Sequence, residues 1–287
     1  MKSPFRYRPL PVRAVNLAGT ALRGAGFTLA GLDPGALLET ARRRTGLTDF
    51  GNEDFRAPFE TLLGACERQA KLSLVGRLAA RSHLLQLLET RLRMHCDRQN
   101  DPRIAEQTIV RPVFLTGLPR SGTTLLHGML ACDPANRTPL TWEVMFPSPP
   151  PATVTDEARI RTADGSLRWL DRLAPAFKRI HPVGALLPQE CIAITAHNFT
   201  SIEFHTLWRV PDYQAWFERD DPRRAYFFHR RFLQHLQRGR PGGRWVLKAP
   251  AHLFDLGSLF AVYPDARLVQ MHRDPREVVA SVASHGT

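Results

Sequence analysis

The chain has 287 residues, and its 39 lysines and arginines against 27 aspartates and glutamates give a formal net charge of +12. This length allows one large α/β domain or one domain with a helical extension, and the dispersed basic residues favour an anionic substrate over a nucleic acid. Apolar runs stay short of the roughly 20 residues that span a bilayer and no signal sequence is seen, so we expect a cytoplasmic protein with at most peripheral membrane contact.

Residues 1–108 lack the alternation of strands and predict a helical N-terminal extension. Five leucines recur there at helical spacing, and Arg81 is the only polar residue on their stripe. They are Leu74, Leu78, Leu85, Leu88 and Leu92. We interpret the stripe as a packing face. Residues 109–287 are predicted to form a second unit.

The segment 112–124 predicts a buried strand, a tight turn and the start of a helix. Its spacing from Gly117 to Gly122 fits the phosphate-binding frame G-x-x-x-x-G-K-S/T, except that Thr123 replaces the lysine. The basic residue is instead Arg120, inside the loop. An arginine there suits a bidentate grip on a tetrahedral oxyanion, so we expect a nucleotide other than ATP.

Backbone amides from Ser121 onward would face an anion at the start of this helix, where the helix dipole also favours negative charge. The hydroxyl groups of Thr123 and Thr124 add further donors. Glycine, proline, serine and threonine are also ordinary turn residues, so the loop needs support from a second segment.

That second segment predicts a strand at 244–249, a helix at 252–262, a strand at 266–272 and a helix from Pro275 onward. A βαβ unit of this kind makes its two strands parallel. Arg273 then follows the carboxyl end of the second strand, and Ser281 lies eight residues later on the helix.

These two segments together resemble the PAPS-dependent sulfotransferases. The loop Gly117-Leu-Pro-Arg-Ser-Gly-Thr-Thr124 is similar to their 5′-phosphosulfate loop, and Arg273 with Ser281 is similar to their 3′-phosphate pair. Five further stretches resemble bacterial sulfotransferases, and the nucleotide region is also similar to tyrosylprotein sulfotransferases. These stretches are 9–16, 45–51, 142–143, 188–191 and 245–250.

The resemblance implies an α/β, P-loop-type three-layer fold with a central parallel sheet. It also implies 3′-phosphoadenosine 5′-phosphosulfate (PAPS) as the sulfuryl donor, PAP as the product and no metal. Relatives continue beyond the last predicted helix, so we expect the sulfotransferase domain of residues 109–287 to be incomplete at its C-terminus.

Sulfuryl transfer to a hydroxyl group resembles phosphoryl transfer through a loose, in-line transition state. Negative charge then accumulates on the bridging oxygen, and we expect Arg120, Lys248 and the loop amides to stabilise it. In the resemblance, Lys248 falls on the transition-state lysine of tyrosylprotein sulfotransferases.

A general base would take the proton of the acceptor hydroxyl. Glu143 is the first candidate, because it lies at about the distance from the loop at which tyrosylprotein sulfotransferases carry their glutamate. Glu190 is the rival, and His181, His197 and His252 are weaker candidates. The pattern leaves this choice open.

Two other functions stay open. A P-loop phosphotransferase that uses ATP is disfavoured by Thr123 and by the lack of a Walker B aspartate. A shortened, non-catalytic nucleotide-binding protein is the other. The acceptor is expected to be a small molecule, a lipid or a carbohydrate, and no residue pattern chooses among them.

The cysteines show neither C-x-x-C pairing nor a histidine-rich spacing, which argues against a structural zinc site and a disulfide framework. They are Cys66, Cys96, Cys132 and Cys191. We expect free thiols in a reducing compartment.

Overall fold

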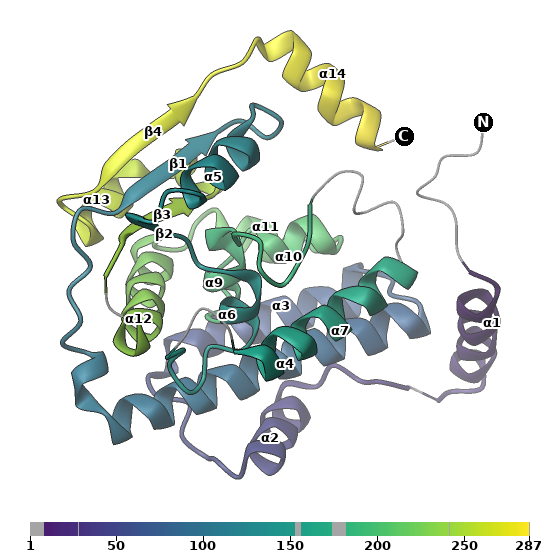
Figure 1. Ribbon diagram of the computed structural model, residues 1–287. Helices are drawn as coiled ribbons and strands as arrows, with labels where there is room; N and C mark the ends of the chain where they lie inside the picture. Colours follow the sequence, from purple (N-terminus) through teal and green to yellow (C-terminus); the bar gives the residue numbers. More distant parts are fainter. Residues whose placement is uncertain (1–8, 28, 153–155, 174–181, 241, 287) are drawn as a thin grey trace.

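The computed structural model describes residues 9–27, 29–152, 156–173, 182–240 and 242–286, and Figure 1 shows helices arranged around a small sheet. The strands are β1 (Val113–Gly117), β2 (Asn136–Arg137), β3 (Arg244–Lys248) and β4 (Arg267–Met271). The helices are α1 (Leu10–Gly24), α2 (Pro34–Thr45), α3 (Arg56–Gln69), α4 (Leu74–Asn100), α5 (Thr123–Ala131), α6 (Thr141–Met145), α7 (Glu157–Leu173), α9 (Cys191–Ala196), α10 (Glu203–Leu207), α11 (Pro211–Phe217), α12 (Arg223–Gly239), α13 (Leu256–Val262) and α14 (Pro275–Gly286). Short 3-10 turns are η2 (Glu53–Phe55), η3 (Pro102–Ile104) and η4 (Pro250–Phe254).

The four strands form one parallel sheet in the order β2-β3-β1-β4. Both strands predicted in the region 244–272 are therefore confirmed, and so is their parallel direction. They are not neighbours, however, because β1 lies between them: Leu115 is opposite Lys248 on one side, and Gly117 is opposite Met271 on the other. The carboxyl ends of β3, β1 and β4 consequently meet at one edge, where open α/β sheets bind ligands.

Alternation along the strands divides the sheet into two apolar faces. Val113, Leu115 and Val246 pack against Leu126 and Leu130 of α5 on one face. On the other face, alternate strand residues pack against α12 and α13 (Figure 1). Those strand residues are Phe114, Trp245 and Leu247. This is the predicted three-layer arrangement.

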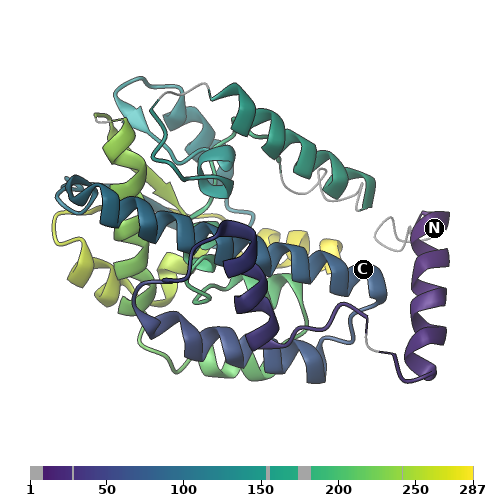
Figure 2. The ribbon, with the colours of Figure 1, turned by 90° about the horizontal axis from the view of Figure 1, so that it is seen from below.

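The helices of the N-terminal part share their core with a later part of the chain. Phe59 of α3 and Leu88 of α4 belong to the same buried cluster as Phe199, Phe204 and Tyr213. Seen from below, α4 runs across the molecule with α2 and α3 beside it (Figure 2). The boundary near residue 108 stays a prediction, because packing joins its two sides.

The leucine stripe of α4 packs as predicted only toward its C-terminal end. Leu85, Leu88 and Leu92 are buried, but Leu78 is 50% exposed, so the prediction was wrong there. The first turns of α4 instead bury Arg77, whose guanidinium donates to the Glu67 carboxylate at 2.8 Å. An ion pair thus occupies the inner side of these turns and leaves the leucine outside.

Candidate nucleotide and transfer site

The phosphate loop runs from the end of β1 to the start of α5, and glycine is required at both ends. Gly117 has φ +152°, and a Cβ atom there would lie 2.7 Å from the Met271 carbonyl oxygen and from Ser121 Oγ. Gly122 has φ +96° and forms the N-cap of α5. The left-handed backbone continues at Arg120, with φ +69°. The loop is therefore held close to β4 in a shape that few sequences adopt.

Donors for an anion gather where the loop enters α5. The amide of Ser121 donates to the Leu118 carbonyl at 3.1 Å, so the prediction that it would face an anion was wrong. The helical ladder starts where the Leu126 amide donates to the Gly122 carbonyl at 3.1 Å, and the amides of residues 122–125 precede it. Ser121 Oγ is buried and has no hydrogen-bond partner among the described residues. Thr124 is exposed, whereas Thr123 is 4% exposed and faces the interior. This arrangement fits a phosphate or sulfate group, with Thr124 better placed than Thr123.

The three residues predicted to grip the nucleotide meet although they are far apart in the sequence. Arg120 Nε donates to Ser281 Oγ at 3.2 Å, and Arg273 Nη1 donates to the Arg120 carbonyl at 2.9 Å. Arg273 also pairs with Glu277 at 2.8 Å, one turn along α14. The start of α14 is thereby fastened to the phosphate loop across the edge of the sheet.

Lys248 connects the loop to the N-cap of α9. Its side chain is only 2% exposed, and its ammonium group donates to Thr124 Oγ1 at 3.1 Å and to the Glu190 carboxylate. Glu190 is itself only 13% exposed. A cation, a carboxylate and a hydroxyl group from three separate elements thus converge at the carboxyl edge of the sheet.

Glu143 lies in a different environment. Its side chain is fully buried in α6, where it accepts a hydrogen bond from the Leu140 amide at 2.9 Å. Arg137 approaches it at 3.4 Å and Arg240 at 3.6 Å. Burial lowers the pKa of Arg137 to about 10, and Glu143 is the counter-charge that opposes this change. These contacts give Glu143 a capping and charge-balancing role, and nothing in the sequence pattern pointed to its two arginines.

Two of the three histidine candidates for the base, His197 and His252, are buried in the core. His181 lies outside the described residues. His197 Nε2 donates to the Val144 carbonyl at 3.1 Å, and His252 Nδ1 hydrogen-bonds to the Tyr226 hydroxyl at 3.0 Å. Burial lowers the pKa of both rings to about 3, so both are neutral and weakly basic at pH 7.

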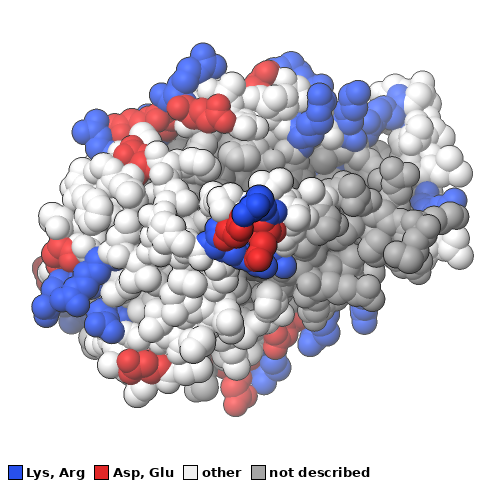
Figure 3. Space-filling model, turned by 90° about the horizontal axis from the view of Figure 1, so that it is seen from above, with Lys and Arg blue, Asp and Glu red and all other residues white. Residues whose placement is uncertain are grey.

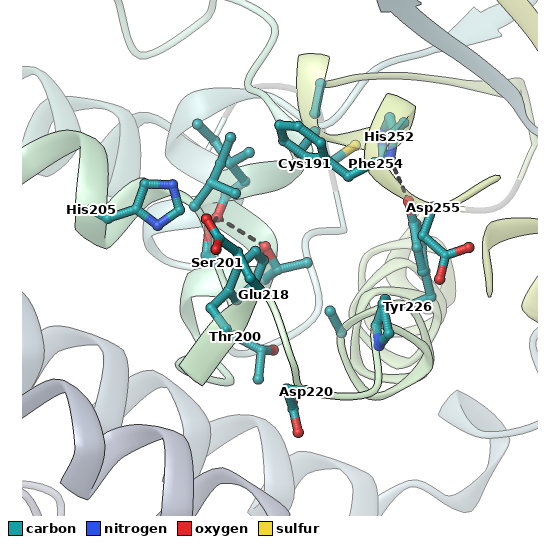
Figure 4. A pocket seen from close by; sticks show the side chains of 18 of the residues that line it. Cys191, Thr200, Ser201, His205, Glu218, Asp220, Tyr226, His252, Phe254 and Asp255 are labelled. Carbon is teal, nitrogen blue, oxygen red and sulfur yellow. Dashed lines mark hydrogen bonds between the residues drawn. The ribbon is translucent and has the colours of Figure 1, made fainter. Parts of the chain in front are cut away.

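A cavity of about 430 Å³ lies among α9, α12 and η4 (Figure 4). Its walls include Cys191 and Ala249, the residues that follow the members of the Lys248–Glu190 pair in sequence, but neither member of the pair and no residue of the phosphate loop. Ala249 belongs to the core on the α12 face, whereas the loop leads into α5 on the opposite face. The cavity is therefore a neighbour of the candidate transfer site and not its phosphate pocket.

Charge is distributed in small groups on the face seen from the side of α14 (Figure 3). Groups of both signs lie at the margin and near the centre, and most of the described surface there is uncharged.

Among the described residues, no three histidine, cysteine, aspartate or glutamate side chains gather as a metal site would require. None of the described helices is long and apolar enough to cross a membrane. Cys66, Cys96, Cys132 and Cys191 are free thiols.

Curated relatives match part of the chain. The omega-hydroxy-beta-dihydromenaquinone-9 sulfotransferases Stf3 of Mycobacterium bovis and Mycobacterium tuberculosis are both 26% identical to it over 189 residues. The match covers 62% of this chain but only 46% of each relative. The chain thus spans about half the length of the curated relatives it matches.

Solved structures show the same fold over more of the chain. Sulfotransferase STF1 from Mycobacterium tuberculosis is 34% identical, with a TM-score of 0.76, covering 84% of this chain and 67% of that one. Sulfotransferase STF9 from Mycobacterium avium is 28% identical, with a TM-score of 0.79 and coverage of 88% and 65%. The α/β, P-loop-type fold is confirmed by this likeness. Residues 112–286, more than half of the chain, match the profile of the sulfotransferase family. The chain belongs to the sulfotransferase family.

Proposed function

We propose that this chain carries the donor site and the transfer site of a sulfotransferase that moves a sulfuryl group from PAPS to the hydroxyl group of a lipid-like acceptor. The observation that carries the proposal is the convergence of Thr124, Lys248 and Glu190 at the carboxyl edge of the sheet. It joins an anion-binding loop to a cation and a carboxylate, which are the groups that sulfuryl transfer to an alcohol requires.

The residues present fit the nucleotide. The loop has no room for a side chain at Gly117, and the buried hydroxyl of Ser121 has no hydrogen-bond partner among the described residues. Arg273 and Ser281 would hold the 3′-phosphate, the group that distinguishes PAPS from ATP, and Arg120 of the phosphate loop contacts both. PAPS, when bound, supplies the sulfuryl group, and PAP is the leaving group.

The side chains of the transfer site have separate tasks. Lys248 presents a nearly buried ammonium group beside the loop, where it stabilises negative charge on the leaving oxygen. Groups of this kind contribute about 100-fold to 1,000-fold to a rate. Glu190 takes the proton of the acceptor hydroxyl, a task worth about 100-fold to 10,000-fold. We assign the general base to Glu190, because its contact with Lys248 places it at the candidate transfer site. Glu143 is instead held by two arginines and by the amide of Leu140 at the start of α6.

A named relative supports a lipid-like class of acceptor. The name of Stf3 identifies omega-hydroxy-beta-dihydromenaquinone-9, a lipid-like alcohol, as what it sulfates. We extend this class to the present chain, with small alcohols and carbohydrates as the other candidates. The four free thiols fit a reducing compartment such as the cytoplasm.

Calorimetric titration with PAP, beside ATP with magnesium, tests the donor site. We expect PAP to bind the purified chain and ATP to bind weakly, and we expect Arg273→Ala to weaken PAP binding by at least tenfold, as loss of a charged hydrogen-bond pair does. Tight ATP binding that is insensitive to Arg273→Ala would support the phosphotransferase instead. PAP binding without transfer to any hydroxyl acceptor would support the non-catalytic nucleotide-binding protein.

A further inference from the structure

Helix α1 lies at the margin of the molecule, beside the start of α4 (Figures 1 and 2). One side of it is fastened there. The amide of Val75 donates to Asn16 Oδ1 at 3.0 Å, and Arg23 Nη2 donates to the Leu72 carbonyl at 3.1 Å. Between these contacts, Gly19 lies so close to Leu74 that a Cβ atom there would be 2.5 Å from the leucine Cβ. The orientation of α1 about its own axis is thus fixed.

The opposite side of α1 is apolar and faces solvent. At about 100° per residue, Leu10, Ala14, Leu17 and Ala21 form one stripe turned away from α4. Leu10 is 76% exposed and Leu17 is 75% exposed, and no residue of α1, all of which the structure describes, is buried. Phe27, just beyond the helix, is a further exposed apolar residue at 62%. A contiguous apolar face of this kind marks an interaction surface.

The charged residues of the same region are all basic. The first 32 residues contain five basic residues and no aspartate or glutamate; the basic residues are Lys2, Arg6, Arg8, Arg13 and Arg23. Arg13 lies on α1 at the flank of the apolar stripe and is exposed. Two copies of this surface would bring like charges together, which opposes self-association. An apolar stripe flanked by Arg13, in a region that has no acidic residue, instead matches an anionic lipid surface.

We propose that α1 docks on the surface of an anionic phospholipid bilayer, with Leu10 and Leu17 entering the interface and Arg13 contacting lipid head groups. The helix has 15 residues, too few to span a bilayer, so it would lie in the plane of the membrane. This surface is remote in sequence from the phosphate loop, and the proposal holds whether or not the chain transfers sulfuryl groups.

Vesicle flotation tests the proposal with the full chain. We expect the protein to float with vesicles of phosphatidylcholine mixed with phosphatidylglycerol, and to stay behind with phosphatidylcholine alone. Leu17→Glu should lower binding by about tenfold or more, because a buried leucine is lost to a charged group. Arg13→Gln should lower it by about fivefold. Leu78→Glu is the matched control, since Leu78 is an exposed leucine on α4, and binding should be unchanged.

Three outcomes would overturn the proposal: equal flotation with both vesicle types, equal loss in Leu17→Glu and Leu78→Glu, or a dimer in sedimentation velocity that Leu17→Glu dissociates. The last would identify a second copy as the occupant. PAP titration of Leu17→Glu keeps the two proposals apart. Normal PAP binding by a variant that no longer floats shows a folded chain with a defective membrane surface, and absence of PAP binding in every variant bears only on the donor site.

Discussion

Three histidines sealed in the core connect the stability of this fold to pH. His197, His229 and His252 are each at most 4% exposed, and burial lowers the pKa of each ring to about 3. His229 Nδ1 hydrogen-bonds to the Tyr263 hydroxyl at 2.8 Å, and its Nε2 has no partner among the described residues. Protonation would therefore place an unsolvated charge in the core, and acid should unfold the protein.

The magnitude follows from the two pKa values. A histidine titrates near 6.5 when unfolded and, at these positions, near 3 when folded. Between these values the unfolded chain binds more protons, so the free energy of unfolding falls as the pH falls below about 6.5. Each ring then contributes about 1.4 kcal/mol per pH unit, or about 2 kcal/mol at pH 5. These three rings give about 6 kcal/mol, comparable to the 5–15 kcal/mol that stabilises a typical domain. His127 and His235, which are also buried and have lowered pKa values, add to it. The buried carboxyl groups of Asp97 and Asp220, whose pKa values are raised, act in the opposite direction.

Urea unfolding at pH 7, 6 and 5 measures this effect. His229→Gln should remove about 2 kcal/mol of the difference between pH 7 and pH 5, because it removes one titrating ring. Leu259→Ala is the control, since it opens a fully buried site without removing a titrating group and should lower stability equally at each pH. A free energy of unfolding that stays constant from pH 7 to pH 5, or an unchanged slope in His229→Gln, would refute the reasoning.

Three further predictions concern the candidate site. Glu190→Gln should slow sulfuryl transfer to an acceptor alcohol by about 100-fold or more while the calorimetric Kd for PAP stays the same; an equal loss of PAP affinity would contradict a base. Glu143→Gln should lower the free energy of unfolding in urea by about 3 kcal/mol, because it leaves Arg137 buried with less counter-charge, and PAP binding should persist; unchanged stability would contradict the buried network. Gly117→Ala should lower the melting temperature and the PAP affinity, because the new Cβ atom would lie 2.7 Å from a β4 carbonyl oxygen. Gly128→Ala is the control, since the space around its Cβ atom is open and neither quantity should fall. Equal effects of the two substitutions would argue against the loop geometry.

Local patterns allowed the sequence to predict β1, β3 and β4, the phosphate loop and the sheet edge, but not the two-residue strand β2. Gly117 and Gly122 are tied to their backbone angles, so their spacing predicts a turn that the structure contains. The position of β1 between β3 and β4 could not be predicted, since strand order depends on packing between distant segments. The choice between Glu143 and Glu190 as the base also depends on packing between distant segments. Both glutamates start short helices, and only tertiary structure puts arginines beside one and Lys248 beside the other.

The Lys248–Glu190 pair has a structural interpretation as well as a catalytic one, because a lysine that is 2% exposed needs a counter-charge whatever its function. Lys248→Met alone removes the buried ammonium group that pairs with the Glu190 carboxylate and should lower the free energy of unfolding by about 3–5 kcal/mol. The double variant Lys248→Met, Glu190→Leu replaces both charges with apolar groups and should recover most of that loss, since a buried ion pair is often no more stabilising than apolar residues of similar volume. Urea unfolding of the single and double variants measures this recovery, and a transfer assay on the same proteins measures activity. If the pair only holds the sheet edge together, activity returns with stability. If Lys248 stabilises the leaving oxygen and Glu190 takes the proton, stability returns and transfer does not.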